Sequence, residues 1–178
     1  MKTNRYLLRF TFLAVIAVLS FAVSAEAQKK KKPVTKKPTT TATVTTNALE
    51  IKEGAEKVSI QLKNVTSFIY KLGGIATGIE DTDKEAEAGK LSKSALDKNA
   101  QFKQAVIQSI RNLRAGLAAM EVEFRTKPGL KPYLLQLEGI TELSGQSEDL
   151  ATAGRFTDSG KVLVTVIGKL ADTLAAMP

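Results

Sequence analysis

A long stretch in the first half of the chain carries apolar or small residues in alternating steps of four and three. The positions are Ile51, Ala55, Val58, Leu62, Val65, Ile69, Leu72, Ala76 and Ile79. This spacing places all nine side chains on one face of an α-helix, as in a coiled coil. Because a single helix cannot bury its own apolar face, the pattern predicts that other helices pack against it.

Three further segments have helical periodicity, and each is bounded by residues that typically start or stop helices. We predict helices at about 48–79, 93–126, 131–153 and 158–177. Four successive helices joined by short connections favour an up-down-up-down antiparallel four-helix bundle. The β-branched run at 162–167 has no second strand to pair with, so we interpret it as helical. The predicted fold class is therefore all-α.

The sequence indicates where the first helix starts and where it ends, and the segment after its end is a candidate contact loop. The sequence Asn47-Ala48-Leu49-Glu50 fits a capping box, which predicts a helix start near Ala48. The polar segment 81–90 follows several glycines, and we interpret it as the connection to the second helix. Because the first two helices are predicted to be longer than the last two, this connection is expected to project from the bundle. The residues of the candidate contact loop are Gly73, Gly74, Gly78, Asp81, Asp83 and Glu85.

The first 27 residues have the three parts of a secretory signal: a basic start, an apolar run at 10–23 and the small-x-small sequence Ala25-Glu26-Ala27. We predict cleavage before Gln28 and a secreted or periplasmic location. The alternative is a retained membrane anchor, although the apolar run is shorter than the roughly 20 residues of a membrane span.

Residues 28–46 are almost entirely Lys, Thr and Pro, which predicts a disordered linker. The domains are thus a signal peptide at 1–27, a linker at 28–46 and a bundle at 47–178.

The excess positive charge belongs to the leader and the linker. The net charge of the whole chain is +8, but 17 basic and 17 acidic residues balance from Ala48 onward. The bundle therefore has no net charge to attract a nucleic acid, and no specific nucleic-acid partner is predicted. The linker is either a solubilising spacer or a tether to an anionic envelope polymer or membrane surface. The tether residues would be Lys29, Lys30, Lys31, Lys32, Lys36 and Lys37.

Missing residue types exclude several chemistries. The chain has no Cys and no His, which removes disulfides, thiolate nucleophiles, most zinc sites and the usual acid–base group of neutral pH. The sequence ATAGRFTDSGKVL at 151–163 resembles the helical hairpin of the soluble periplasmic b-type cytochromes. That resemblance implies haem held by His and Met. Met120 and Met177 are present, but without His that haem site cannot form, and no cofactor is predicted.

The acidic residues do not suggest a metal site or a catalytic pair. Asp81, Asp83 and Glu85 are spaced like the start of a calcium loop, but Ala86 and Ser92 stand where that loop needs Gly and Glu. We interpret the pairs Glu121–Glu123 and Glu138–Glu142 as solvated charges rather than the acid and base of a glycosidase. The chain also contains no Gly-x-Ser-x-Gly motif and no phosphate-binding loop. We therefore predict that it is not an enzyme.

These observations predict a secreted, non-enzymatic helical-bundle protein that acts as an interaction or envelope-associated module, with a protein partner or the envelope itself as its target. The alternative is a carrier or sensor of a small apolar ligand in the bundle core. Small residues that could leave such a gap are Ala76, Ser144, Ser147 and Ala151. The oligomeric state is left open, because Ile60 and Val122 lie off the main apolar faces and could form a dimer contact or be isolated exposed residues.

Overall fold

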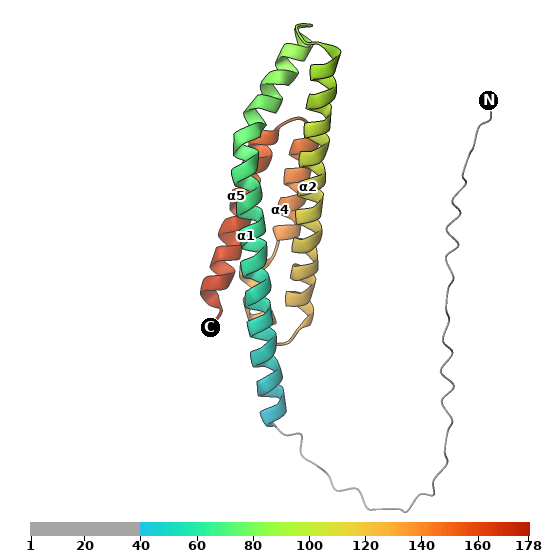
Figure 1. Cartoon of the computed structure of the whole chain (residues 1–178). Helices are drawn as coiled ribbons and strands as arrows, with labels where there is room; N and C mark the ends of the chain where they lie inside the picture. Colours follow the sequence, from blue (N-terminus) through green and yellow to red (C-terminus); the bar gives the residue numbers. More distant parts are fainter. Residues whose placement is uncertain (1–39) are drawn as a thin grey trace, which may run out of the picture. The chain divides into compact units, whose positions relative to one another are not determined.

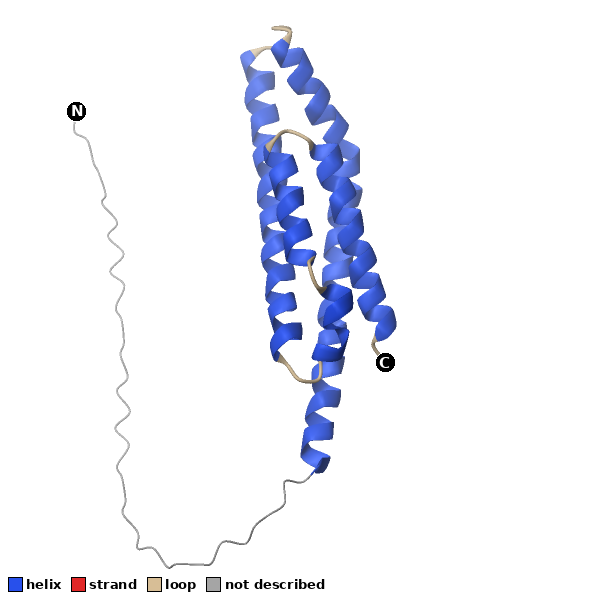
Figure 2. Ribbon diagram, turned by 180° about the vertical axis from the view of Figure 1, so that it is seen from behind, coloured by secondary structure: helices blue, strands red, loops and turns tan. Residues whose placement is uncertain are grey.

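The computed structural model describes residues 40–178, with side chains from residue 45 onward. This part of the chain is entirely helical and contains no strand (Figure 2). The helices are α1 (Thr40–Glu87), α2 (Lys93–Thr126), the 3-10 turn η1 (Lys131–Tyr133), α3 (Leu134–Leu137), α4 (Ile140–Thr152) and α5 (Phe156–Ala176). The predicted all-α class is confirmed for these residues. The expected signal peptide and residues 28–39 of the linker lie outside them.

The long helices lie side by side in a closed order. α1 packs against α2 and α5, and α4 packs against the same two helices (Figure 1). The short α3 contacts α5. The connection between α1 and α2 reaches beyond the connection between α4 and α5, so the α1–α2 hairpin extends past the shorter helices (Figures 1 and 2).

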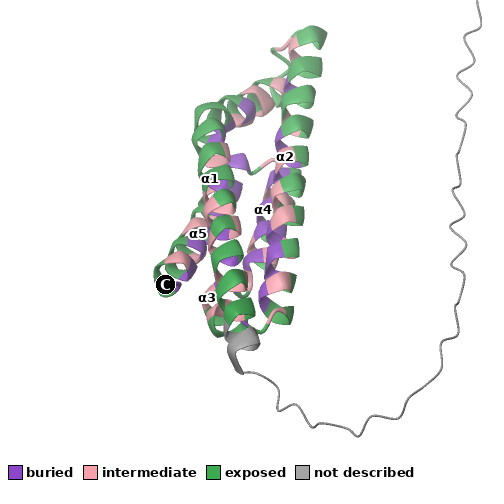
Figure 3. Ribbon diagram, turned by 60° about the horizontal axis from the view of Figure 1, so that its bottom comes forward, coloured by how far each residue is buried: buried purple, intermediate pink, exposed green. Residues whose placement is uncertain are grey.

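The predicted apolar face of α1 is buried as expected. Val58, Val65, Leu72, Ala76 and Ile79 are at most 3% exposed, and the other four positions of the repeat are half-buried. Buried residues line the sides of the helices that face one another (Figure 3). They form two clusters. The larger includes Leu117, Phe124, Ile140, Leu163 and Leu170, and the smaller includes Leu72, Val106, Ile110, Ala151 and Phe156.

α1 is longer at both ends than the sequence predicts. It begins at Thr40 rather than near Ala48, so Asn47 lies inside the helix and is not its cap. The side chain of Glu50 instead accepts a hydrogen bond of 2.8 Å from the amide of Gly129. The helix also continues through Gly73, Gly74 and Gly78 to Glu87, which places most of the expected 81–90 connection within the helix. Burial of Leu72, Ala76 and Ile79 stabilises the glycine-containing section more than the glycines weaken it.

The predicted helix at 131–153 is divided into three pieces. Pro132 lies in η1, α3 ends at Leu137, and Gly139 adopts a left-handed conformation with φ of 87° before α4 begins. A glycine takes this conformation without the steric penalty of other residues, which explains the break. The prediction of one continuous helix was wrong here, because the apolar periodicity continues across the turn.

α2 and α5 agree closely with their predicted ranges. α2 covers 93–126, and Ser92 is its cap: the Ser92 hydroxyl accepts a hydrogen bond from the amide of Ala95 at 3.3 Å. The β-branched run at 162–167 is helical, within α5. The connection between α1 and α2 shrinks to residues 88–92, where Gly89 has a positive φ of 67°.

Candidate contact surface

Three hollows follow one another along the groove between α1 and α2, and we call this surface the outer groove. Their volumes are about 280, 180 and 270 Å³, in order from the α1–α2 connection. The first is lined by Gly74, Ile75, Gly78, Ile79, Thr82, Asn99 and Phe102. The second is lined by Phe68, Lys71, Leu72, Ile75, Phe102, Ala105, Val106 and Ser109. The third is lined by Lys57, Ile60, Gln61, Gly116, Ala119, Met120 and Glu123.

The upper half of the outer groove exposes large apolar side chains. Phe102 is 59% exposed and Ile75 is 44% exposed, and both line the first two hollows. Ile60, in the third hollow, is 54% exposed. Such residues lie singly on many protein surfaces, but here Ile75 and Phe102 line the same two hollows, and apolar residues gathered in this way are typical of an interaction surface.

Charged residues are nearly absent from the middle of the outer groove. Lys71 is the only charged residue that lines the two upper hollows, and Lys57 and Glu123 line the lower one. The other charges of central α2 lie elsewhere: Arg111 and Arg114 bind Glu148 of α4. Depletion of charge is a feature of interface cores.

Three of the four glycines of α1, namely Gly73, Gly74 and Gly78, are not required by the packing. A Cβ atom built at Gly73, Gly74 or Gly78 meets no atom within 4 Å. Each glycine nevertheless weakens a helix by about 1 kcal/mol relative to alanine. Gly74 and Gly78 line the outer groove, whereas Gly73 faces a separate hollow between α1 and α5.

The predicted contact loop is therefore not a loop, and its residues do not form one site. Asp83 is an internal contact: it accepts hydrogen bonds from Asn99 at 2.7 Å and from Lys103 at 2.8 and 2.9 Å. Asp81 pairs with Lys84 one turn along α1, and Glu85 is exposed. The six lysines of the predicted tether lie outside the described residues.

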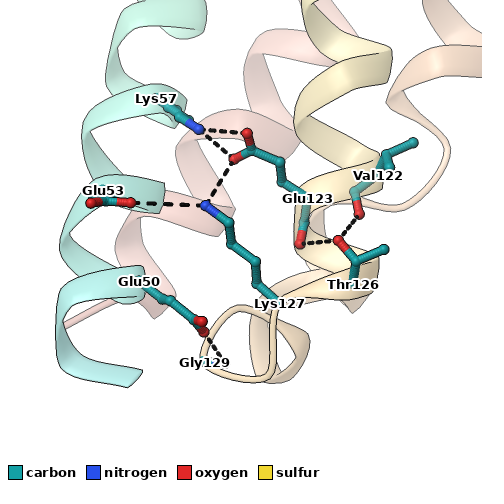
Figure 4. Close-up of polar contacts among 8 residues, drawn as sticks. All are labelled: Glu50, Glu53, Lys57, Val122, Glu123, Thr126, Lys127 and Gly129. Atoms are coloured by element: carbon teal, nitrogen blue, oxygen red, sulfur yellow. Dashed lines mark hydrogen bonds and ion pairs between the residues drawn. The ribbon is translucent and has the colours of Figure 1, made fainter. Parts of the chain in front are cut away.

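A network of charges closes the lower end of the outer groove (Figure 4). The Lys57 ammonium donates hydrogen bonds to both carboxylate oxygens of Glu123, and Lys127 lies 3.6 Å from Glu123 and 3.8 Å from Glu53. The hydrogen bond from Lys57 is the main cause that lowers the pKa of Glu123, outweighing the opposite effect of burial. This network joins α1 to the C-terminal end of α2.

Glu121 has a structural role that the sequence interpretation missed. Its carboxylate accepts hydrogen bonds from the amides of Gly139 and Thr141 and, at 2.6 Å, from the Thr141 hydroxyl. It therefore caps the N-terminus of α4 from a neighbouring helix and stabilises the turn at Gly139. Burial would raise the pKa of Glu121, but these hydrogen bonds and the nearby Arg125 outweigh it, and the pKa lies below its ordinary value of 4.5.

Glu80 of α1 caps the N-terminus of α5 in the same way. Its two oxygens accept hydrogen bonds from the Thr157 amide at 2.7 Å and from the Thr157 hydroxyl at 3.0 Å. Both capping glutamates are far in sequence from the helix they cap, so no local sequence motif predicts these caps. The acidic residues of the long hairpin thus hold the shorter helices in place.

The small residues of α4 are packed rather than arranged around a pocket. Ser144, Ser147 and Ala151 are at most 1% exposed, and the Ser147 hydroxyl lies 2.8 Å from that of Ser159. Ala76 differs, because it lines the hollow of about 230 Å³ between α1 and α5. The other residues there are Ile69, Leu72, Gly73, Thr77, Phe156, Thr157, Gly160, Lys161 and Val164.

The two candidate dimer residues do not line the same surface in the structure. Ile60 lines the outer groove, whereas Val122, which is 59% exposed, lines none of its three hollows. Within residues 40–178, no group of three acidic side chains is placed to hold a metal ion, and no helix has the length and apolar character of a membrane span.

No family model, curated protein or solved structure matches the chain.

Proposed function

We propose that this chain is an exported, non-enzymatic interaction module that acts by contact through the outer groove. The observation that carries the proposal is a groove with exposed Phe102 and Ile75 and with one charged residue, Lys71, in its upper two hollows. One quarter of the residues in the whole chain are charged, but Lys71 is the single charged residue among those that line the two upper hollows. Exposed apolar surface of this kind is stabilised when a partner covers it.

We also propose that the helices form an up-down-up-down antiparallel four-helix bundle. The proposal is supported by the short connections and by the contacts of α1 and α4 with both α2 and α5. In this arrangement the inner faces of α1 and α2 are covered by α4 and α5, and the outer groove is left for a partner.

The basic linker completes the proposed module. Six lysines within residues 29–37 follow the expected cleavage point, and they carry the positive charge that the bundle lacks. A flexible basic arm is attracted to anionic envelope polymers and lipid headgroups, and this attraction is screened by salt. The arm would hold the protein near the envelope while the outer groove makes the specific contact.

The experiment is a fractionation of the exported chain from a bacterial host. We expect the wild-type protein in the envelope fraction at low salt, and loss of that association when residues 28–37 are deleted. Phe102→Glu should weaken retention further in moderate salt, because it places a charge in the groove. The matched control is Val122→Glu, which introduces the same charge on the same helix at a residue that is 59% exposed like Phe102. If the deletion and Phe102→Glu both leave the distribution unchanged, the proposal is wrong.

The hollow between α1 and α5 favours a second candidate, a carrier of a small apolar ligand. Its volume of about 230 Å³ and its lining by Ile69, Leu72, Phe156 and Val164 suit a compact apolar molecule. Native mass spectrometry of the protein purified from its source would show a bound molecule of defined mass. Its absence, together with no rise in melting temperature on adding apolar compounds, would exclude this candidate.

A further inference from the structure

We propose that the occupant of the outer groove is a second copy of this chain, paired face to face and antiparallel, with α2 against α2. The inference rests on the proposed function and names the partner for the same surface. Three features carry it: the spacing of the groove residues, the charges at the two ends of the groove, and the positions of its large side chains.

The groove residues repeat with the spacing of a coiled-coil seam on both helices. On α2, the steps from Phe102 through Ala105, Ser109, Gly116 and Ala119 follow the alternating three-and-four pattern, with exposed Asn112 at the remaining position. This second seam lies beside the buried one that includes Val106, Ile110 and Leu117. A helix with two adjacent seams is typical of one that packs against helices on both sides. The described chain covers only the inner seam.

The charges at the ends of the groove are complementary when one copy is turned end over end. At the lower end, Lys57 is on α1 and Glu123 is on α2. At the upper end the signs are exchanged: Glu85 lies one heptad beyond Gly78 on α1, and Lys98 lies one heptad before Ala105 on α2. Lys57 and Glu123 already form hydrogen bonds with each other within one copy. Antiparallel pairing adds two charges to this pair, because it brings Lys98 of the other copy to Glu123 and Glu85 of the other copy to Lys57. Opposite charges at both ends set the register of the pair, and in this register Lys71 of one copy lies opposite Lys71 of the other at the centre of α1.

The large side chains also favour the antiparallel orientation. Ile75 and Phe102 lie at the same level, because both line the first two hollows. If two copies paired in parallel, these four side chains would meet one another. When Lys98 is aligned with Glu123, the midpoint of α2 falls between Ile110 and Arg111, so Phe102 of one copy meets the section near Ala119 of the other. There the side chains are small, and a large side chain can pack against them.

The first test is the mass of the exported chain in solution, measured by sedimentation velocity over a range of protein concentrations. We expect twice the monomer mass for the wild-type protein. Phe102→Glu should weaken pairing at least tenfold, whereas Val122→Glu, which adds the same charge away from the groove, should leave it unchanged. Circular dichroism and a thermal melt of each variant separate a loss of pairing from a loss of folding. A monomer at every concentration, a larger assembly, or equal effects of the two substitutions would overturn the inference.

The second test measures orientation, and the absence of native cysteine makes it direct. A single Ser94→Cys substitution, in the first turn of α2, takes one spin label per copy. With a rise of 1.5 Å per residue and a midpoint near residue 110, antiparallel pairing places the two labels about 50 Å apart. Parallel pairing would place them within roughly 25 Å, because paired helices lie about 8–10 Å apart. A distance near 50 Å supports the inference, and a short one overturns it.

Failure of self-pairing can be told apart from failure of the proposed function. If the chain is a monomer but Phe102→Glu still weakens envelope retention, the second copy is excluded as the occupant while the groove remains a contact surface. If the chain pairs as described but Phe102→Glu has no effect on envelope retention, self-pairing stands and the groove has no role at the envelope.

Discussion

Replacing Glu121 with alanine tests the most specific structural claim, that a carboxylate of α2 caps α4. The substitution removes hydrogen bonds to the Gly139 amide, the Thr141 amide and the Thr141 hydroxyl. Loss of a side-chain cap destabilises proteins by about 0.5–2 kcal/mol. Amide groups left without a partner in a partly buried position add about 1–3 kcal/mol. Since these contributions overlap, we expect the free energy of unfolding to fall by about 2–3 kcal/mol.

The assay is urea and thermal unfolding followed by circular dichroism. For a folded body of this size, a loss of 2–3 kcal/mol lowers the melting temperature by roughly 6–12 °C. The matched control is Glu142→Ala, because Glu142 lies in the first turn of α4 but is exposed. It should change stability by less than about 0.5 kcal/mol. The capping argument is refuted if the two substitutions destabilise the protein equally.

The pH dependence gives an independent check on the same carboxylate. The pKa of Glu121 in the folded protein is below the ordinary value of 4.5, so the unfolded chain binds the proton more readily than the folded one. Its stabilising contribution is therefore complete above pH 5, and it is lost as the pH falls below 4.5 toward the folded pKa. Glu121→Gln keeps the size of the side chain without its charge. We expect the stability difference between wild type and Glu121→Gln to shrink between pH 6 and pH 3, and a constant difference would contradict this explanation.

The remaining predictions concern glycine, buried serine and the core. Gly78→Ala should raise the free energy of unfolding by about 1 kcal/mol, because nothing obstructs the new methyl group. Gly139→Ala should lower the free energy of unfolding by about 1–2 kcal/mol, because φ is positive at this residue. Thermal melts measure both effects. Ser147→Ala should lower the free energy of unfolding by about 1–2 kcal/mol, because it leaves the buried Ser159 hydroxyl without its partner. In a double-mutant cycle, the protein with both Ser147→Ala and Ser159→Ala should lose less stability than the sum of the two single changes. Leu163→Ala should lower the free energy of unfolding by about 2–5 kcal/mol, as measured by urea unfolding, because Leu163 is fully buried in the larger core cluster.

The sequence predicted the helices well wherever one apolar face continues without interruption. The range of α2 and the burial of Val58, Val65 and Leu72 follow directly from periodicity, because burying such a face requires neighbouring helices. Local propensity was a poorer guide. Three glycines and a polar segment suggested that the first helix ends early, but tertiary contacts maintain it to Glu87.

The break at Gly139 could not be predicted from its own surroundings. Leu137 and Ile140 continue the apolar pattern across it, and both are fully buried. What stabilises the turn is Glu121, eighteen residues earlier and on another helix. The interpretation of Glu121 as a solvated charge was wrong for the same reason: the residues that bind it become neighbours only in the folded chain. The second seam of α2 was also not predicted, although Phe102, Ala105 and Ser109 have the same spacing as the buried seam.

The glycines of α1 connect stability to the proposed contact. Gly73 and Gly78 leave open space around their Cα atoms in the same way, but Gly78 lines the outer groove and Gly73 faces the hollow beside α5. If Gly78 had no role beyond the fold of the single chain, alanine at this position would increase stability without weakening any other property. If the groove receives another helix, the added methyl group narrows the space for it, so Gly78→Ala should stabilise the monomer and weaken pairing. Gly73→Ala should give the same gain in stability with pairing unchanged. A glycine that weakens its own helix is then explained by what packs against it.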